Sequence, residues 1–182
     1  DGSAADVAQA VAAAKSAQPE WAEASPEVRS DLLEKIAVAL FDRAAELGEL
    51  LAREEGKLRG EGMGEVLRAA RIFRYFSGEA LRRHGLTLES TRPGLDVATY
   101  REALGVVGLI TPWNFPIAIP AWKAAPAMAF GNSVVLKPAN VTPAVAYALA
   151  EVIHEAGVPA GVFNLVLGRG DVGRAIVDHE DV

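Results

Sequence analysis

The chain has 182 residues, of which 51% are hydrophobic, and it carries a formal net charge of −6. This length allows a sizeable buried core, the negative charge disfavours binding to nucleic acid or to anionic lipid, and no apolar run is long enough to span a membrane. The absence of cysteine excludes disulfides and thiolate metal sites, and the three histidines are too far apart in sequence to predict a metal site: His84, His154 and His179.

Three helices are predicted in the first half of the chain, over residues 5–17, from Pro26 to about Gly56, and over residues 64–84. Ser25 is the expected N-cap of the second helix, and Gly85 is expected to end the third. Apolar side chains recur at intervals of three and four residues, so each helix should bury one face. In the third helix the residues expected on that face are Val66, Leu67, Ala70, Phe73, Phe76 and Leu81.

The segment that follows these helices has the pattern of a half-exposed strand. Residues 91–94, Thr-Arg-Pro-Gly, predict a turn, and residues 96–102 alternate apolar and polar side chains. An unpaired strand edge invites pairing, so this strand is expected to join another subunit. Residues 1–104 are therefore expected to form a helical region with an oligomerisation-type strand.

From residue 105 onward, short apolar strands alternate with helices. Strands are predicted at 106–110, 133–137 and 162–167, with helices at 119–130 and 142–156 between them. Continuous Val, Ile and Leu runs separated by helices are typical of a parallel sheet covered on both faces. We therefore expect an α/β fold in which residues 105–182 form the first half of a Rossmann-like βαβαβ domain.

Ligands of such a sheet gather at the carboxyl ends of its strands, where this chain places two polar residues. Asn114 follows the first strand in a loop stiffened by prolines, and a rigidly held amide donor is what an oxyanion hole requires. Lys137 ends the second strand, and a lysine beside an apolar core should meet a polar group. Snorkelling of Lys137 to solvent at the sheet edge is the alternative.

Three blocks of the sequence together resemble the aldehyde dehydrogenase superfamily, in its order and at its spacing. The blocks are GVVGLITPWNFP at 105–116, KAAPAMAFGNSVVLKPAN at 123–140, and TPAVAYALAEVIHEAGVPAGVFNLVLGRG at 142–170. The stretch EEGKLRGEGMGEVLRAARIFRYFSGEAL at 54–81 is similar to the preceding helical region of the family. The resemblance covers nearly the whole chain and implies the N-terminal, cofactor-binding portion of an enzyme that oxidises an aldehyde with NAD or NADP.

The resemblance also implies roles for individual residues. Asn114 would match the amide that stabilises the oxyanion of a thiohemiacetal. Lys123 would match a lysine in a water-filled proton path, and an ordinary surface lysine is the alternative. On the cofactor side, Lys137 would bond the adenosine ribose hydroxyls and Gly170 would let the backbone approach the adenine. The other residues expected at the cofactor are Ile110, Thr111, Pro112 and Trp113, which would line its nicotinamide half, and Ala139 and Asn140.

Two features depart from the family pattern. Many members have a carboxylate where this chain has Asn140, and a neutral amide does not repel a 2′-phosphate, so NAD and NADP are both expected cofactors. The second departure is that this chain lacks the nucleophilic cysteine and an identifiable general base, which come later in the sequence of the family. Glu151 and Glu155 are expected to be exposed on a helix and therefore not to act as the base. Both ends of the chain are expected to be cut, and the chain alone is expected to be inactive.

Residues 168–173, Gly-Arg-Gly-Asp-Val-Gly, satisfy the G-x-G-x-x-G pattern of dinucleotide-binding loops. They follow the third predicted strand, not the first, and the acidic residue expected about 20 positions later would lie beyond Val182. A helix-entry loop that borders the adenine pocket is therefore favoured over a pyrophosphate cradle.

These features predict the oxidation of an aldehyde to a carboxylic acid by a cytoplasmic homodimer or homotetramer. Within the superfamily, residues 60–65 and Asn140 favour a bacterial semialdehyde dehydrogenase. A non-catalytic nucleotide-binding or oligomerisation module is the alternative. A helical interaction protein without a cofactor is a third possibility, but it leaves the positions of Asn114 and Lys137 unexplained. No metal, nucleic acid or membrane partner is expected.

Overall fold

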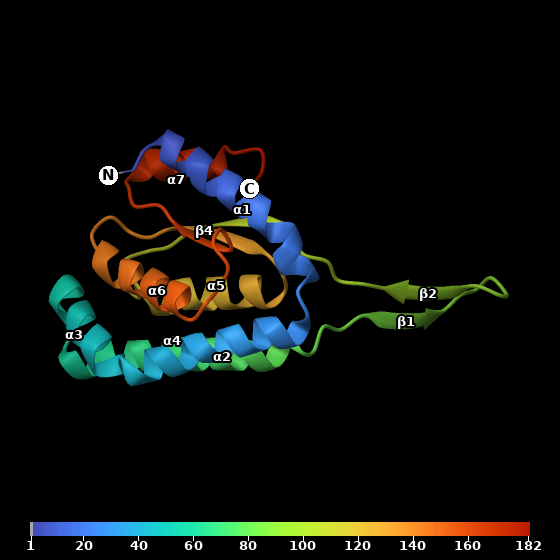
Figure 1. Cartoon of the computed structure of the whole chain (residues 1–182), viewed down its shortest axis with the longest axis horizontal. Helices are drawn as coiled ribbons and strands as arrows, with labels where there is room; N and C mark the ends of the chain where they lie inside the picture. The colour runs from blue at the N-terminus through green and yellow to red at the C-terminus, as the bar shows by residue number, and fades with distance from the viewer. Residues whose placement is uncertain (1) are drawn as a thin grey trace.

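The computed structural model describes residues 2–182, which form a parallel sheet between layers of helices (Figure 1). On one face of the sheet lie α1 (Ala4–Glu23) and α7 (Gly170–Val177). On the other face lie α5 (Ala118–Ala129) and α6 (Pro143–Glu155), and a further layer of helices covers these two.

The sheet consists of β3 (Val106–Ile110), β4 (Ser133–Lys137) and β5 (Phe163–Leu165), all parallel, with β4 in the centre. Every residue of β4 is buried, as the central strand of a doubly covered sheet requires. The strand pairing sets Ile110 opposite Lys137, so the carboxyl ends of β3 and β4 lie side by side. The expected α/β fold is confirmed, and β3 and β4 have the predicted bounds.

Two apolar cores join the layers. The smaller core packs Val7 and Val11 of α1 and Ile176 of α7 against Val135 of β4. The larger core fills the opposite face and contains side chains from both halves of the chain, such as the fully buried Phe73 and Leu149. The division of the chain at residue 104 stays a prediction.

The third layer consists of α2 (Pro26–Asp42), α3 (Ala44–Glu55) and α4 (Arg59–Ala80). The prediction of one continuous helix from Pro26 to Gly56 is wrong, because the chain bends at Arg43, between α2 and α3. The bend lets α3 contact both α4 and α6, where Leu47 is buried. Tertiary packing here overrides a continuous helical pattern.

Two other helices differ from the prediction at their ends. α1 continues past Pro19 to Glu23, and its buried Trp21 donates a hydrogen bond from Nε1 to the carbonyl of Met128 at 3.0 Å. α4 begins earlier than predicted and ends well before residue 84. Leu81 therefore follows the helix and is exposed, which corrects its expected place in the core.

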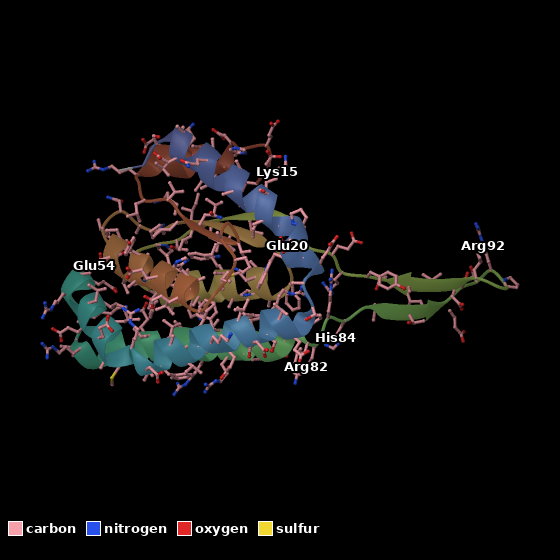
Figure 2. All side chains as sticks on the ribbon, viewed as in Figure 1. Lys15, Glu20, Glu54, Arg82, His84 and Arg92 are labelled. Carbon is pink, nitrogen blue, oxygen red and sulfur yellow. The ribbon has the colours of Figure 1, made fainter. Side chains whose placement is uncertain are left out.

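The strand expected at 96–102 is shorter than predicted, and it has a partner within the chain. β2 (Asp96–Thr99) pairs antiparallel with β1 (Leu86–Glu89), which was not predicted, and every residue of this ribbon is exposed. Gly85 does not end α4; a Cβ there would lie 2.1 Å from the carbonyl oxygen of Thr99, so the base of the ribbon requires glycine. The ribbon extends far from the body, with Arg92 at its tip (Figure 2).

Candidate functional site

The carboxyl ends of β3 and β4 bring three of the predicted cofactor residues together. The backbone N–H of Thr111 donates to the carbonyl of Lys137 at 3.2 Å, next to the register pair of Ile110 and Lys137. Gly173 of α7 lies over both strands, since a Cβ there would be 3.6 Å from the methylenes of Lys137 and 3.7 Å from Ile110. α7 therefore covers this end of the sheet.

Lys137 is 6% exposed, so it does not snorkel to solvent. Its Nζ donates to the carbonyl oxygens of Pro138 at 2.5 Å and of Gly168 at 3.0 Å, and no carboxylate among residues 2–182 forms an ion pair with it. Burial lowers the pKa of Lys137, and the negative charge of Asp171 opposes that shift. An ammonium has three N–H donors, so one remains for a further acceptor.

Thr111, the residue after the register partner of Lys137, is a second buried polar residue at this edge of the sheet. The hydroxyl of Thr111 is buried and makes no hydrogen bond within residues 2–182. A hydroxyl-rich ligand such as a ribose can accept the remaining N–H of Lys137, because each of its hydroxyls donates and accepts. Lys137 therefore fits the sugar of a dinucleotide.

The other predicted cofactor residues surround this pair more loosely. Ala139 is half-buried and Asn140 is exposed, both in the loop between β4 and α6. Gly170 is the first residue of α7, and a Cβ built on it would meet no atom within 4 Å, so its backbone is open to approach. Pro112 and Trp113 are exposed in the loop after β3.

Asn114 is exposed in the same loop, and its side-chain amide makes no hydrogen bond with residues 2–182. Its backbone is held in place, because the carbonyl of Asn114 accepts a hydrogen bond from Lys57 Nζ at 2.8 Å. The loop thus presents a free amide donor on a tethered main chain, which suits the stabilisation of a developing oxyanion.

An ion pair between the half-buried Lys57 and the buried Glu65, absent from the sequence prediction, anchors this loop. Glu65 of α4 accepts from Lys57 Nζ at 2.6 Å through one oxygen. Its other oxygen accepts from the backbone N–H groups of Ile117 at 3.1 Å and Ala118 at 3.2 Å, at the start of α5. One carboxylate therefore fixes both Lys57 and the N-terminus of α5, where it also meets the positive end of the helix dipole.

Two carboxylates surround the ammonium of Lys57. Burial opposes the charge of Lys57, but hydrogen bonds with Glu65 and with Glu55, 3.1 Å away, outweigh it and raise the pKa of the lysine. Burial also raises the pKa of Glu55, and Lys57 opposes that shift. The ammonium lies 4.3 Å from the ring centroid of Phe115, a cation–π contact that holds the residue after Asn114.

One signal in the sequence could have revealed Glu65. It lies four residues before Ala69 and eight before Phe73, so it shares the buried face of its helix with two core residues. A carboxylate on such a face requires partners, because an unpaired buried charge is very costly.

A second glutamate performs a similar task for the neighbouring loop. Glu54, labelled near α3 in Figure 2, accepts from the backbone N–H groups of Ala144 at 2.6 Å and Val145 at 3.0 Å. These residues begin α6, so Glu54 caps the helix that follows the Lys137 loop. No lysine among residues 2–182 pairs with Glu54.

The remaining predicted residues lie apart from these contacts. Lys123 is exposed on α5 and makes no hydrogen bond or ion pair within residues 2–182, so its role in proton transfer stays a prediction. Glu151 and Glu155 are exposed on α6, as expected. Residues 168–173 form the entry to α7, and the contact of Gly170 with adenine stays a prediction.

Neither a membrane span nor a metal centre is visible in residues 2–182. None of their helices is both long and apolar enough to cross a bilayer. The same residues contain no group of three or more histidine, aspartate or glutamate side chains placed to hold a metal ion.

The sequence is similar to a known family over its whole length. The profile of the aldehyde dehydrogenase family matches residues 1–182. The α-ketoglutarate semialdehyde dehydrogenase of Haloferax volcanii is 47% identical over 176 residues, which are 96% of this chain and 36% of that protein. The lactaldehyde dehydrogenase of Escherichia coli is 42% identical over 184 residues, covering 100% of this chain and 38% of that protein.

A solved structure has nearly the same backbone. PnpE in complex with nicotinamide adenine dinucleotide matches with a TM-score of 0.96 at 39% identity, over 99% of this chain and 37% of that one. The chain thus spans just over a third of the length of the proteins it matches.

Proposed function

This chain belongs to the aldehyde dehydrogenase family, and we propose that it is the N-terminal part of an enzyme that oxidises a semialdehyde to a carboxylic acid with NAD or NADP. The observation that carries the proposal is the edge of the sheet, where the free amide of Asn114 and the buried Lys137 follow adjacent strands. The semialdehyde is supported by the name of the Haloferax relative, which is 47% identical.

Asn114 would bind the carbonyl oxygen of the aldehyde as negative charge develops on it. Lys57 and Glu65 hold the loop before any substrate arrives, so the amide needs little reorganisation. Lys123 would relay a proton near the same loop. The thiol nucleophile and the general base would come from the remaining part of the protein, since this chain contains no cysteine.

The dinucleotide would lie across the carboxyl ends of β3 and β4. Lys137 would hold the adenosine ribose, with Ala139 and Asn140 beside it and Gly170 against the adenine. Ile110, Thr111, Pro112 and Trp113 would line the nicotinamide half. When bound, the cofactor supplies the acceptor for the hydride that leaves the aldehyde carbon. The neutral Asn140 does not repel a 2′-phosphate, which keeps NADP beside NAD.

The β1–β2 ribbon would join a second subunit in a cytoplasmic homodimer or homotetramer. Its strands are exposed on every residue and carry large apolar side chains, among them Leu86, Leu88 and Val97. An exposed apolar ribbon is a template for pairing with another chain. Sedimentation of the full-length protein tests this assembly, and a monomer would contradict it.

Steady-state kinetics of the full-length protein test the proposed reaction. We expect aldehyde-dependent reduction of NAD or NADP, with kcat reduced about 100- to 1,000-fold in Asn114→Ala and with unchanged dinucleotide affinity. The competing function is a nucleotide-binding or oligomerisation module, which would bind the dinucleotide or self-associate without turnover. Binding with no oxidation of any aldehyde would therefore favour the module and contradict the proposed enzyme.

A further inference from the structure

A hollow of about 450 Å³ lies at the base of the β1–β2 ribbon. Three segments form it: the end of α4 with the residues after it, the residues between β2 and β3, and the turn between α5 and β4. Figure 2 shows Arg82 and His84 at this place. Because these segments precede β3 and β4, the hollow lies at the opposite edge of the sheet from the candidate site.

The walls of the hollow contain three arginines, Arg82, Arg83 and Arg101. Arg82 has a counter-charge, because it pairs with Glu79 at 3.0 Å. Arg83 and Arg101 make no hydrogen bond or ion pair among residues 2–182. Both also line an adjoining hollow of about 400 Å³. Two guanidinium groups therefore keep all their N–H donors available at one place.

A buried arginine adds to this positive charge. Arg29 of α2 is 2% exposed, and its hydrogen bonds go to backbone carbonyls, among them that of Ala129 at 3.0 Å. No carboxylate among residues 2–182 pairs with Arg29. Burial lowers the pKa of Arg29, and the nearby charge of Arg83 lowers it further. An anion bound by Arg83 would offset the repulsion between these two guanidinium groups.

The remaining charged residues leave the hollow positive. Glu102 lines it and pairs with no cation among residues 2–182, so its single charge offsets only one of the arginines that lack a partner. His84 lines the same hollow and adds positive charge when it is protonated. The dipole of α4 accounts for cations at its C-terminal end, but it does not account for Arg101, which follows β2.

One wall of the hollow is held rigid by a side-chain amide. The Oδ1 of Asn132 accepts from the backbone N–H groups of Leu104 at 2.7 Å and Gly105 at 3.1 Å, and its Nδ2 donates to the carbonyl of Ala127 at 3.1 Å. Leu104 and the half-buried Phe130 supply apolar surface beside the arginines. The hollow therefore combines guanidinium donors with a fixed apolar wall.

We propose that this hollow binds the phosphate group of a small phosphate ester. Arg83 and Arg101 would donate hydrogen bonds to the phosphate oxygens, and Leu104 and Phe130 would contact the carbon part of the ester. A phosphate ester carries a charge of about −1.5 to −2 at neutral pH and has three acceptor oxygens, so it suits two guanidinium groups better than a single carboxylate does. The site goes beyond the proposed aldehyde oxidation and does not depend on it.

A carboxylate of a second subunit, or of the remaining part of the protein, is the competing partner for these arginines. In that case the full-length protein would bind no phosphate at the hollow. Substitution of Arg83 or Arg101 would then weaken the assembly or the fold.

Isothermal titration of glycerol 3-phosphate into the full-length protein tests the proposal, with glycerol as the uncharged match and inorganic phosphate as the anion without a carbon part. We expect glycerol 3-phosphate to bind more tightly than inorganic phosphate, and glycerol not to bind. Arg83→Met and Arg101→Met should each weaken binding about tenfold or more. Arg101→Lys keeps the charge without the planar fork and should lose less. Glu102→Gln should strengthen binding, because it removes the opposing charge.

Arg59→Met is the matched control, because Arg59 belongs to the same helix and pairs with Glu49 at 2.7 Å, at the other end of α4. It removes one positive charge and should leave the affinity for glycerol 3-phosphate within about twofold of wild type. Lys137→Met should also leave this affinity unchanged, because Lys137 belongs to the proposed dinucleotide site.

Three results would overturn the phosphate site. The first is the absence of binding to the wild-type protein, and the second is equal affinity of wild type, Arg83→Met and Arg101→Met. The third is a loss of affinity in Lys137→Met but not in the arginine variants, which would place the phosphate in the dinucleotide site. Since no turnover is measured, none of these results contradicts the proposed aldehyde oxidation.

Discussion

The two loops at the edge of the sheet are supported by lysines in opposite electrical environments. Lys57 lies under the loop after β3, within 3.1 Å of two carboxylates, those of Glu55 and Glu65. Lys137 ends β4, and among residues 2–182 the hydrogen-bond acceptors of its Nζ are the backbone carbonyls of Pro138 and Gly168. The half-buried Lys57 has carboxylate partners, and the buried Lys137 has none among residues 2–182.

The difference separates a structural charge from a ligand-binding one. A buried charge that is paired on the protein side holds its neighbours in place, whereas a buried charge without a counter-ion gains from a ligand that supplies acceptors. Lys57 therefore belongs to the support of the Asn114 loop, and Lys137 to the surface that receives the cofactor.

The largest effect is expected where the charge balance is broken. Glu65→Ala leaves the half-buried Lys57 beside Glu55 alone and removes the cap of α5, so we expect a loss of about 3 kcal/mol in the free energy of unfolding. Urea denaturation of the full-length protein measures it. The loss in the double variant with Lys57→Met should be smaller than the sum of the two single losses, because each substitution breaks the same pair; an additive loss would contradict the ion pair.

A smaller effect is expected at the cofactor end. Asn140→Glu places a carboxylate beside the proposed ribose site, so the affinity for NADP should fall about tenfold while that for NAD is kept. Titration of each dinucleotide into the full-length protein measures the change, with the neutral Asn140→Gln as control. Unchanged NADP affinity in Asn140→Glu would place the 2′-phosphate elsewhere.

The two capping glutamates give the next comparison. Glu54→Ala removes the cap of α6 without leaving a lysine unpaired, so we expect a loss of only about 1 kcal/mol in the free energy of unfolding. Urea denaturation beside Glu65→Ala measures both losses under one set of conditions. Equal losses would show that capping alone, and not the pair with Lys57, explains the role of Glu65.

The smallest effect is a pH dependence of opposite sign for the two lysines. The pKa of Lys137 is lowered by burial, so just below the ordinary value of 10.5 the unfolded chain binds more protons and stability rises with pH. The pKa of Lys57 is raised, so its contribution is complete below 10.5 and is lost as pH rises through the higher folded value. Urea midpoints between about pH 8 and about pH 11 should show both trends relative to Lys137→Met and Lys57→Met. Identical pH profiles for the two variants would contradict the distinction.

The parts of the fold that follow local sequence patterns were predicted well. β3 and β4 have the predicted bounds because each is a short run rich in Val, Ile and Leu, which is typical of the strands of a covered parallel sheet. The bend at Arg43 escaped prediction because it is set by contacts of α3 with α4 and α6, and local propensity does not report such contacts. β1 alternates apolar and polar residues, but it is only 4 residues long and fully exposed, so no buried face marks it as a strand.

The candidate site residues at the strand ends were predicted from the sequence, but the residues that hold the loops in place were not. Asn114 and Lys137 were found because the carboxyl ends of parallel strands concentrate ligand contacts. Glu65 was missed because its backbone partners, Ile117 and Ala118, are about fifty residues away in sequence. Lys137 is buried because α7 covers it. The sequence spacing alone could not decide between burial of Lys137 and its exposure to solvent.

The central claim is that the uncompensated Lys137 receives the dinucleotide, and titration of NAD and NADP into the full-length protein tests it most directly. Lys137→Met should weaken binding of the preferred dinucleotide about 10- to 100-fold, because a hydrogen bond from a buried ammonium is lost, while the protein stays folded. Lys57→Met, compared where it remains folded, should change this affinity much less. Equal affinity of wild type and Lys137→Met would contradict the account.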